Sequence, residues 1–316
     1  EADIVLTIPS CRMSGAARVA GVLSRGLRKL YPDATIVIFV TDRADFEYPD
    51  WFDEKAHICQ ISTELENLRR DEKNACLLDL IRGLRTKKLF NVNSRLCWEL
   101  IQQFNMQISS MMEVYCYLFT WDLNEHGHKG GYPISFVQGI FEHVRAYICD
   151  NSALQGELID RYMLPQVMAD KLLVLHTPGD PSDLSFENVF EQRRKEKRGL
   201  RAIWAGRFDR QKRFDIVKEI AVKRPDIEIL AWGKRVLDDS SDDGGEMPPN
   251  ITLMGTYDSF DDMPWQDSDF YLYTSEWDGV PTILIDAANR AIPVVSSIAG
   301  GTGDIVTEDT GWPVYD

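Results

Sequence analysis

The sequence has very little positive charge in its C-terminal part, where residues 251–316 contain 12 acids and a single base, Arg290. Residues 1–250 are nearly balanced, with 38 acids and 34 bases. A protein that binds the nucleic-acid backbone needs a basic face, so this distribution argues against nucleic acid as a partner. One local basic cluster is expected to be a solvated helix face; it consists of Arg69, Arg70, Lys73, Arg82, Arg85, Lys87, Lys88 and Arg95.

Several other patterns are missing. No run of 18 apolar residues occurs, so we expect no membrane-spanning helix. The six cysteines form no CxxC pair, which argues against a zinc site and a disulfide framework and fits a reducing compartment. No GxGxxG fingerprint supports a dinucleotide cofactor. Glu1-Ala2-Asp3 leads directly into a strand and does not read as a signal peptide.

Short apolar runs alternate with helical patterns along the whole chain. The pattern predicts two α/β domains with doubly wound parallel sheets: residues 1–180, a charged linker over 181–199, and residues 200–316. Ligands of such sheets bind at the carboxyl ends of the strands, so we expect an active site in a cleft between the domains. Strands are predicted at 3–9, 35–40, 56–61, 88–92, 114–119, 146–149, 172–176, 201–205, 227–231, 251–253, 270–274 and 293–296. Helices are predicted at 15–31, 65–84, 95–104, 134–143, 153–162, 214–223 and 281–290.

Three loops after predicted strands contain residues suited to binding. "SCRMSGAAR" (10–18) opens a helix whose N–H groups can face an anion. "AGRFDRQK" (205–212) supplies Arg207 and Lys212, which together suit a diphosphate. "WDGVPTILID" (277–286) places Asp278 in a loop and Asp286 on the helix that follows, with Pro281 expected at the first helical position. Asp286 lies in an apolar run, so its carboxylate is expected to need a partner.

The second half resembles a known family. "AGRFDRQKRFDIV", "SEWDGVPTILIDAANRAIPVVSSIAGGTGDIV" and "GWPV" resemble, in order, the second domain of family-four retaining glycosyltransferases of the GT-B fold. The family pattern is Gly-Arg with a Lys five residues after the Arg, then Ser-x-x-Glu-Gly, a second Glu eight residues on, a Pro-Val-Val strand and a Gly-Gly turn. The resemblance is strong over about 200–316 and loose in the first half.

The resemblance implies a nucleotide-sugar donor, UDP- or GDP-linked, with no metal and no further cofactor. Arg207 and Lys212 would bind the diphosphate, and Asp278 would meet hydroxyls of the transferred sugar. Asp286 would hold the ribose. The donor would also be lined by backbone groups of Gly279, Val280 and Thr282 and approached by Gly15 from the first domain.

Two departures from the family pattern stand out. Both expected glutamates are aspartates, Asp278 and Asp286, each one methylene shorter. The sequence also stops soon after "GWPV", where the family continues with helices, so we expect a C-terminally truncated domain or one module of a longer polypeptide.

Candidate catalytic and acceptor residues of the first half come from two loops. "FTWDLNEHGHKGGYP" (119–133) is polar and glycine-rich after a buried strand. It supplies Asp122 and His126 as catalytic candidates and His128 as an acceptor-binding candidate, although a surface loop with incidental histidines is the alternative. "NVNSR" (91–95) supplies Asn93 and Ser94 as further acceptor-binding candidates.

The function implied is transfer of a sugar, with retained anomeric configuration, to a glycan or lipid-linked acceptor in surface polysaccharide or lipopolysaccharide synthesis. The expected location is the cytoplasm, with peripheral contact at the inner face of the membrane left open. A retaining glycoside hydrolase is disfavoured because it leaves Arg207 and Lys212 unexplained. A nucleotide-sugar epimerase on the same fold and a catalytically silent sugar- or nucleotide-binding module remain as alternatives.

Overall fold

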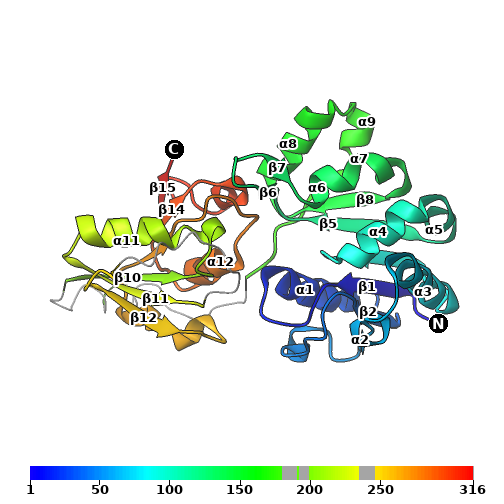
Figure 1. Cartoon of the computed structure of the whole chain (residues 1–316), viewed down its shortest axis with the longest axis horizontal. Helices are drawn as coiled ribbons and strands as arrows, with labels where there is room; N and C mark the ends of the chain where they lie inside the picture. Colours follow the sequence, from blue (N-terminus) through cyan, green and yellow to red (C-terminus); the bar gives the residue numbers. More distant parts are fainter. Residues whose placement is uncertain (180–190, 192–198, 235–245, 316) are drawn as a thin grey trace. The chain divides into compact units, whose positions relative to one another are not determined.

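The computed structural model describes residues 1–179, 191, 199–234 and 246–315, and the chain divides into two compact units. Unit 1 is Glu1–Thr177 and unit 2 is Pro178–Asp316. The predicted linker at 181–199 lies outside the described residues, except for Glu191 and Gly199. Each unit is built on its own parallel sheet (Figure 1).

Unit 1 contains a seven-stranded sheet in the order β3-β2-β1-β4-β5-β8-β9, with every pair parallel. The chain first adds strands on one side of β1 and then, from β4 onward, on the other. The strands are β1 (Ile4–Ile8), β2 (Ile36–Val40), β3 (His57–Gln60), β4 (Lys88–Asn91), β5 (Glu113–Leu118), β8 (Ala146–Cys149) and β9 (Leu172–Val174). A separate antiparallel hairpin is formed by β6 (Asp122–Leu123) and β7 (Lys129–Gly130).

Helices connect these strands and cover both faces of the sheet. The first begins after Ser14, whose hydroxyl accepts the Ala17 N–H at 3.2 Å as an N-cap. The α-helices are α1 (Gly15–Leu30), α2 (Ser62–Leu65), α3 (Arg70–Gly83), α4 (Arg95–Gln103), α5 (Asn105–Met111), α6 (Tyr132–Ser135), α7 (Val137–Ile140), α8 (Ser152–Tyr162) and α9 (Gln166–Ala169). Two 3₁₀ turns are η1 (Pro49–Trp51) and η2 (Phe141–His143).

Successive side chains along the strands of unit 1 point to opposite faces of the sheet and pack into two separate hydrophobic cores. Val5 belongs to the core that α3, α4, α5, α7 and α8 cover, whereas its neighbours Ile4 and Leu6 belong to the core that α1 covers. This alternation follows from the two-residue period of a strand. Both faces of β1 are therefore buried, which explains why four of its five residues are apolar, Thr7 being the exception.

Unit 2 contains a six-stranded parallel sheet in the order β12-β11-β10-β13-β14-β15. Its strands are β10 (Leu200–Ala205), β11 (Ile227–Trp232), β12 (Ile251–Gly255), β13 (Phe270–Tyr273), β14 (Val294–Ser297) and β15 (Trp312–Val314). The helical elements with described bounds are α11 (Phe214–Lys223), α12 (Thr282–Asn289), η3 (Arg210–Lys212), η4 (Phe260–Asp262), η5 (Trp265–Asp267) and η6 (Gly300–Asp304).

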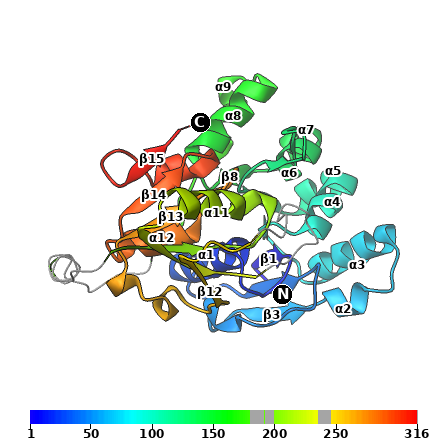
Figure 2. The ribbon, with the colours of Figure 1, turned by 60° about the vertical axis from the view of Figure 1, so that its left-hand side comes forward.

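The two longer helices of unit 2 pack on opposite faces of its sheet. Phe214, Val217 and Ala221 of α11 belong to one core, and Leu284 and Ala287 of α12 belong to the other. Figure 2 shows β14 and β15 following β13 along the sheet. The loops that leave β10 and β13 therefore diverge, one toward each face.

The predicted doubly wound α/β architecture is confirmed in both units. Two predicted helices are wrong in detail. The helix predicted at 65–84 is broken, because Glu72 accepts the Arg69 N–H at 2.9 Å and starts α3 at Arg70. The helix predicted at 134–143 is a series of short pieces, interrupted by the non-helical backbone of Phe136 (φ −125°). In the described part of the chain, no helix is both long and apolar enough to cross a membrane.

Candidate functional site

The binding residues predicted in the second half meet at one point of unit 2. Strands β10 and β13 are neighbours, and the chain continues from β10 toward β11 on one side and from β13 toward β14 on the other. The carboxyl ends of two such strands are the usual ligand position of a doubly wound sheet. Arg207 and Lys212 follow β10, and Asp278 follows β13.

Lys212, Tyr273 and Asp278 form a hydrogen-bonded cluster at this point. The Lys212 ammonium donates to the Tyr273 hydroxyl at 3.1 Å and forms an ion pair with Asp278. Tyr273 also donates to the same Asp278 oxygen. The side chains of Lys212 and Asp278 are 19% and 20% exposed, so a ligand can still reach both charges. Desolvation, reinforced by the Asp278 charge, raises the pKa of Tyr273 far above its ordinary value and keeps the hydroxyl a donor.

This cluster explains why the first acid is the shorter one. The Asp278 carboxylate is already in hydrogen-bond contact with Lys212 and Tyr273. A glutamate with the same backbone would carry its carboxylate one methylene further, into the space that these two groups occupy. The sequence predicts Lys212 and Asp278 as binding residues but does not single out Tyr273, which lies at the end of an apolar strand and resembles a core residue.

Arg207 is held beside the cluster by the residues that follow it. Its Nε lies 2.7 Å from a carboxylate oxygen of Asp209, and it also donates to Gln211. Asp209 is buried and accepts the Lys212 N–H at 3.1 Å, which fixes the start of η3. The Arg207 side chain is 45% exposed, so its guanidinium remains accessible to an anion.

The loops after β10 and β13 are joined by several hydrogen bonds. Gln211 donates from its side chain to the Trp277 carbonyl at 2.9 Å, and its own carbonyl accepts the Glu276 N–H at 2.8 Å. Arg210 forms an ion pair with Glu276 at 2.9 Å and stacks over the Trp277 ring, 5.3 Å from its centroid. These contacts fix Lys212 and Asp278 relative to each other before any ligand binds.

Glycines allow two close backbone approaches in this region. Gly300 has a φ of +59°, and a Cβ there would lie 2.2 Å from the Asp278 carbonyl oxygen, so no side chain fits without movement. The next residue, Gly301, donates its N–H to the same carbonyl at 3.1 Å. Gly233 approaches Gly206 even more closely, at 1.8 Å from an ideal Cβ to the carbonyl oxygen. The predicted Gly-Gly turn, Gly300 and Gly301, thus packs against the backbone of the Asp278 loop and hydrogen-bonds to it.

The other predicted donor residues lie along the start of α12. Gly279 and Val280 are buried, and Thr282 is the first helical residue. Pro281 is the N-cap, one position before the first helical residue where we expected it. Asp286 is buried, as its apolar neighbours suggested, and Arg290 lies 3.9 Å from its carboxylate. The structure therefore supplies the partner that a buried acid needs.

The candidates of the 119–133 loop belong to the hairpin of β6 and β7. Asp122 lies in β6, and the side chains of His126 and His128 are exposed around the turn. The Asn124 side chain accepts the N–H groups of both histidines at 2.9 Å, which defines the turn. The hairpin brings the two rings to 6.2 Å between centroids but gives neither a buried partner among the contacts that the structure describes.

The acceptor-binding candidates Asn93 and Ser94 have different surroundings. Asn93 adopts a φ of +68° and lines a pocket. Ser94 is completely buried, caps α4 through the Cys97 N–H at 3.0 Å and contacts the Thr41 hydroxyl at 2.7 Å. Gly15 is exposed, and a Cβ there would have no neighbour within 4 Å.

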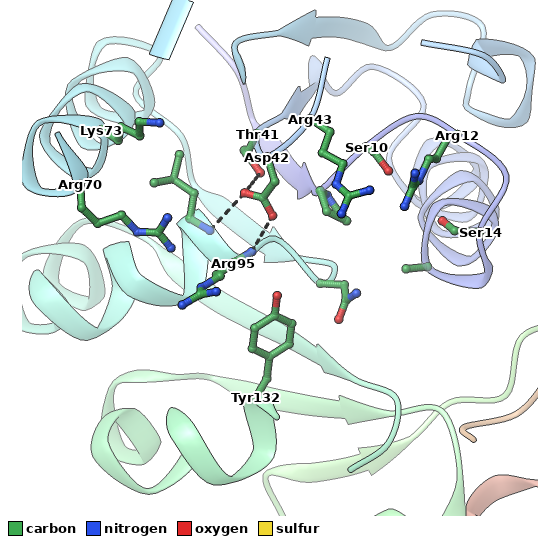
Figure 3. Close-up of a pocket in the computed structure, with 14 residues that line it drawn as sticks. Ser10, Arg12, Ser14, Thr41, Asp42, Arg43, Arg70, Lys73, Arg95 and Tyr132 are labelled. Carbon is green, nitrogen blue, oxygen red and sulfur yellow. Dashed lines mark hydrogen bonds between the residues drawn. The ribbon is translucent and has the colours of Figure 1, made fainter. Parts of the chain in front are cut away.

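The pocket beside Asn93 has a volume of about 420 Å³ (Figure 3). It lies where β1 and β4 are neighbours and the chain changes direction along the sheet of unit 1. Its walls come from the loops after β1, β2 and β4 and from α1, α3, α4 and α6; they include Arg12, Arg43, Arg70, Lys73 and Arg95. Three members of the basic cluster that we expected to be a solvated helix face are therefore pocket residues, namely Arg70, Lys73 and Arg95.

Comparisons with known proteins identify the fold. No family model and no curated protein sequence matches the chain. Among solved structures, the lipopolysaccharide outer core galactosyltransferase WaaB in its apo form has a TM-score of 0.71 and 14% identity, over 99% of this chain and 85% of that chain. Anabaena Alr3699/HepE in complex with UDP and glucose has a TM-score of 0.69 and 14% identity, over 100% of this chain and 86% of that chain. TarM has a TM-score of 0.58 and 12% identity, over 77% of this chain and 48% of that chain. The chain has the GT-B fold, as predicted.

Proposed function

We propose that this chain is a retaining glycosyltransferase that moves a sugar from a nucleoside diphosphate to a glycan or lipid-linked acceptor. The observation that carries the proposal is the cluster of Lys212, Tyr273 and Asp278 at the direction change of the unit 2 sheet. It offers a cation for a diphosphate next to a carboxylate for sugar hydroxyls. The fold agrees, since a structure with the same fold contains UDP and glucose.

Each donor residue has a distinct task in this proposal. Arg207 and Lys212 stabilise the charge of the diphosphate, the guanidinium through two parallel hydrogen bonds and the ammonium as a point charge. Asp278 accepts hydrogen bonds from hydroxyls of the transferred sugar, and Asp286 accepts those of the ribose. Backbone groups of Gly279, Val280 and Thr282, together with Gly15, line the donor.

The proposed reaction retains the configuration of the anomeric carbon. The acceptor hydroxyl attacks that carbon on the face from which the diphosphate departs. The bond from carbon to the diphosphate oxygen breaks, and the departing diphosphate takes the hydroxyl proton. Arg207 and Lys212 stabilise the leaving group without a metal, and the protein mainly orients the reactants. Asp122 and His126 are the catalytic candidates of unit 1, and Asn93 and His128 are its acceptor candidates. Ser94, the third acceptor candidate, is fully buried and caps α4, so it is not placed to contact an acceptor directly.

Calorimetry with UDP and GDP tests the donor site. We expect one of the two nucleotides to bind and Arg207→Ala to weaken its binding about tenfold or more, because a charge-assisted bond is lost. Arg224→Ala is the matched control, since Arg224 pairs with Asp226 on an exposed turn. If neither nucleotide binds the wild type, or if Arg207→Ala binds as tightly as the wild type, the proposed donor site is wrong.

Turnover of a panel of nucleotide sugars tests the reaction. Proton NMR of the product is expected to show the anomeric configuration of the donor, and an inverted product would contradict the mechanism.

The second candidate, a catalytically silent sugar- or nucleotide-binding module, is favoured by the ion pair that already occupies Asp278. Nucleotide binding without transfer from any donor would support that alternative. A role in surface polysaccharide synthesis, in the cytoplasm or peripherally at the inner face of the membrane, is part of the proposal.

A further inference from the structure

We propose that the pocket of unit 1 binds a phosphate or diphosphate group carried by the acceptor. The inference rests on the proposed function, because it names the chemistry of the acceptor for that transfer. The group can belong to a soluble sugar phosphate or to a lipid-linked sugar diphosphate, which share this chemistry.

The charge of the pocket wall is the first argument. Five cationic side chains line the pocket, and the only acid among the lining residues is Asp42. This excess stands out because the whole chain carries a net charge of −15. Figure 3 shows Arg12 and Arg43 on one side of Asp42 and Arg70 and Lys73 on the other. Cations gathered around one cavity lower the energy of a multiply charged anion inside it.

Two of these cations lack a fixed counter-charge. Within the described residues, Arg43 and Lys73 form no ion pair, although both reach the pocket. Arg12 has only a long contact, 4.0 Å from its Nε to Asp45. An internal carboxylate therefore does not satisfy these side chains, and their charge is available to a ligand.

The other two guanidinium groups are fixed in position by one carboxylate outside the pocket lining. Arg70 donates two hydrogen bonds to Glu99, and Arg95 donates from its Nε to the same carboxylate at 3.1 Å. Desolvation would raise the pKa of Glu99, but the hydrogen bonds from Arg70 and Arg95 outweigh it and lower that pKa. Glu99 thus stays ionised and orients both cations before a ligand arrives.

The Asp42 carboxylate accepts the free N–H groups at the N-terminus of α4, at one side of the cavity. Its two oxygens accept the N–H groups of Arg95 at 3.0 Å and Leu96 at 3.3 Å. Desolvation raises the pKa of Asp42, and these hydrogen bonds oppose the shift. The helix N-terminus is therefore already occupied, so an external anion is expected to meet the side-chain cations instead.

The size and polarity of the pocket fit a phosphate with a sugar attached. A volume of about 420 Å³ lies in the range of small-molecule sites. Ser10, Ser14, Asn93 and Tyr132 add hydroxyl and amide groups to the lining. A carboxylate brings one negative charge, whereas a phosphate monoester brings about −1.5 to −2 at neutral pH, which suits an excess of several cations better.

Calorimetry with inorganic pyrophosphate tests the pocket, using protein with saturating UDP and GDP so that a donor site for either nucleotide is filled. We expect Arg43→Ala/Lys73→Ala to raise the pyrophosphate Kd at least about tenfold, because two charge-assisted contacts are lost. Arg82→Ala/Lys29→Ala makes the same charge change at exposed positions outside the pocket lining and should leave the Kd unchanged. Equal pyrophosphate affinity in Arg43→Ala/Lys73→Ala and the wild type would overturn the proposal.

Nucleotide binding separates this proposal from the proposed function. The Kd for UDP should be the same in Arg43→Ala/Lys73→Ala and in the wild type. If both UDP and pyrophosphate bind more weakly in that variant, the pocket belongs to the donor site and the inference is wrong. If no nucleotide binds at all but pyrophosphate still depends on Arg43 and Lys73, the proposed function fails and the anion site stands.

Transfer assays identify the source of the phosphate. A soluble sugar phosphate and a short-chain prenyl diphosphate-linked sugar are compared as acceptors with their phosphate-free counterparts. We expect the KM of the accepted phosphorylated compound to rise about tenfold in Arg43→Ala/Lys73→Ala, with little change in kcat, since ground-state binding is lost. A phosphate-free acceptor with the same KM as its phosphorylated form in the wild type would refute the assignment.

Discussion

Replacing Lys212 by methionine would test the donor cluster most directly. Lys212→Met keeps the aliphatic stem and removes only the ammonium, which contacts Tyr273 at 3.1 Å and pairs with Asp278. Tyr273 and the Gly279 N–H still donate to Asp278 in the variant, so the carboxylate keeps two partners. The substitution therefore removes one charge from the cluster with little change in packing.

The expected effect is larger on nucleotide affinity than on folding. A hydrogen bond to a charged group contributes about 1.5–3 kcal/mol, which corresponds to an increase of the UDP Kd by about 10- to 150-fold. The Asp278 side chain is 20% exposed and can be hydrated in the variant. The loss of folding stability should therefore remain near the low end for a lost partner, about 1–2 kcal/mol.

Isothermal titration calorimetry and thermal unfolding measure the two quantities on the same samples. Lys223→Met is the matched control, because Lys223 is 76% exposed at the end of α11 and pairs only with Glu219 at 3.6 Å among the described contacts. A UDP Kd for Lys212→Met within threefold of the control would refute the role of Lys212. A large loss of stability with unchanged affinity would make the cluster a structural ion pair.

Three further predictions follow from other features. Gly300→Ala should lower stability by at least about 1 kcal/mol and weaken UDP binding, because a Cβ there collides with the Asp278 carbonyl. Gly303→Ala, whose Cβ would meet only an ordinary contact at 3.5 Å, should be nearly neutral in the same melting and binding assays. Glu99→Gln should lower the Tm at pH 7. The difference should shrink as the pH falls below about 4.5, because the lowered pKa of Glu99 stabilises the fold only while the group is ionised. EDTA should not change the transfer rate, since Arg207 and Lys212 supply the positive charge, and activity restored by added Mg²⁺ would contradict this.

The fold could be predicted from the sequence because parallel strands that are buried on both faces appear as short, mostly apolar runs. Ile4–Ile8 is buried at every position and apolar at all but Thr7, since both of its faces are covered, and a helical pattern follows it. Breaks inside helical patterns were harder to predict. The start of α3 depends on one side-chain contact, from the Arg69 N–H to Glu72, which competes with a continuous helix. The two-stranded hairpin is too short for a strand pattern to be recognised in the sequence.

The candidate donor residues could be singled out in the sequence because they keep a fixed order and spacing within two loops. The pocket of unit 1 could not, since its cations come from several segments that only the fold brings together. Arg12 and Arg43 lie outside the basic cluster and are each unremarkable in the sequence. The sequence signal that existed was the basic cluster, and the pattern alone does not distinguish a pocket wall from a solvated face.

The fixed carboxylates around the unit 1 pocket have a consequence for ligand selectivity. Asp42 and Glu99 are negative charges fixed in the protein. They neutralise part of the positive charge of the pocket wall and cannot be displaced by other anions. A monovalent ion such as chloride or acetate gains little in such a field, whereas an ion of higher valence still gains net attraction. The pocket should therefore stay open to its ligand at the salt concentrations of a cell, where weaker anions are far more abundant.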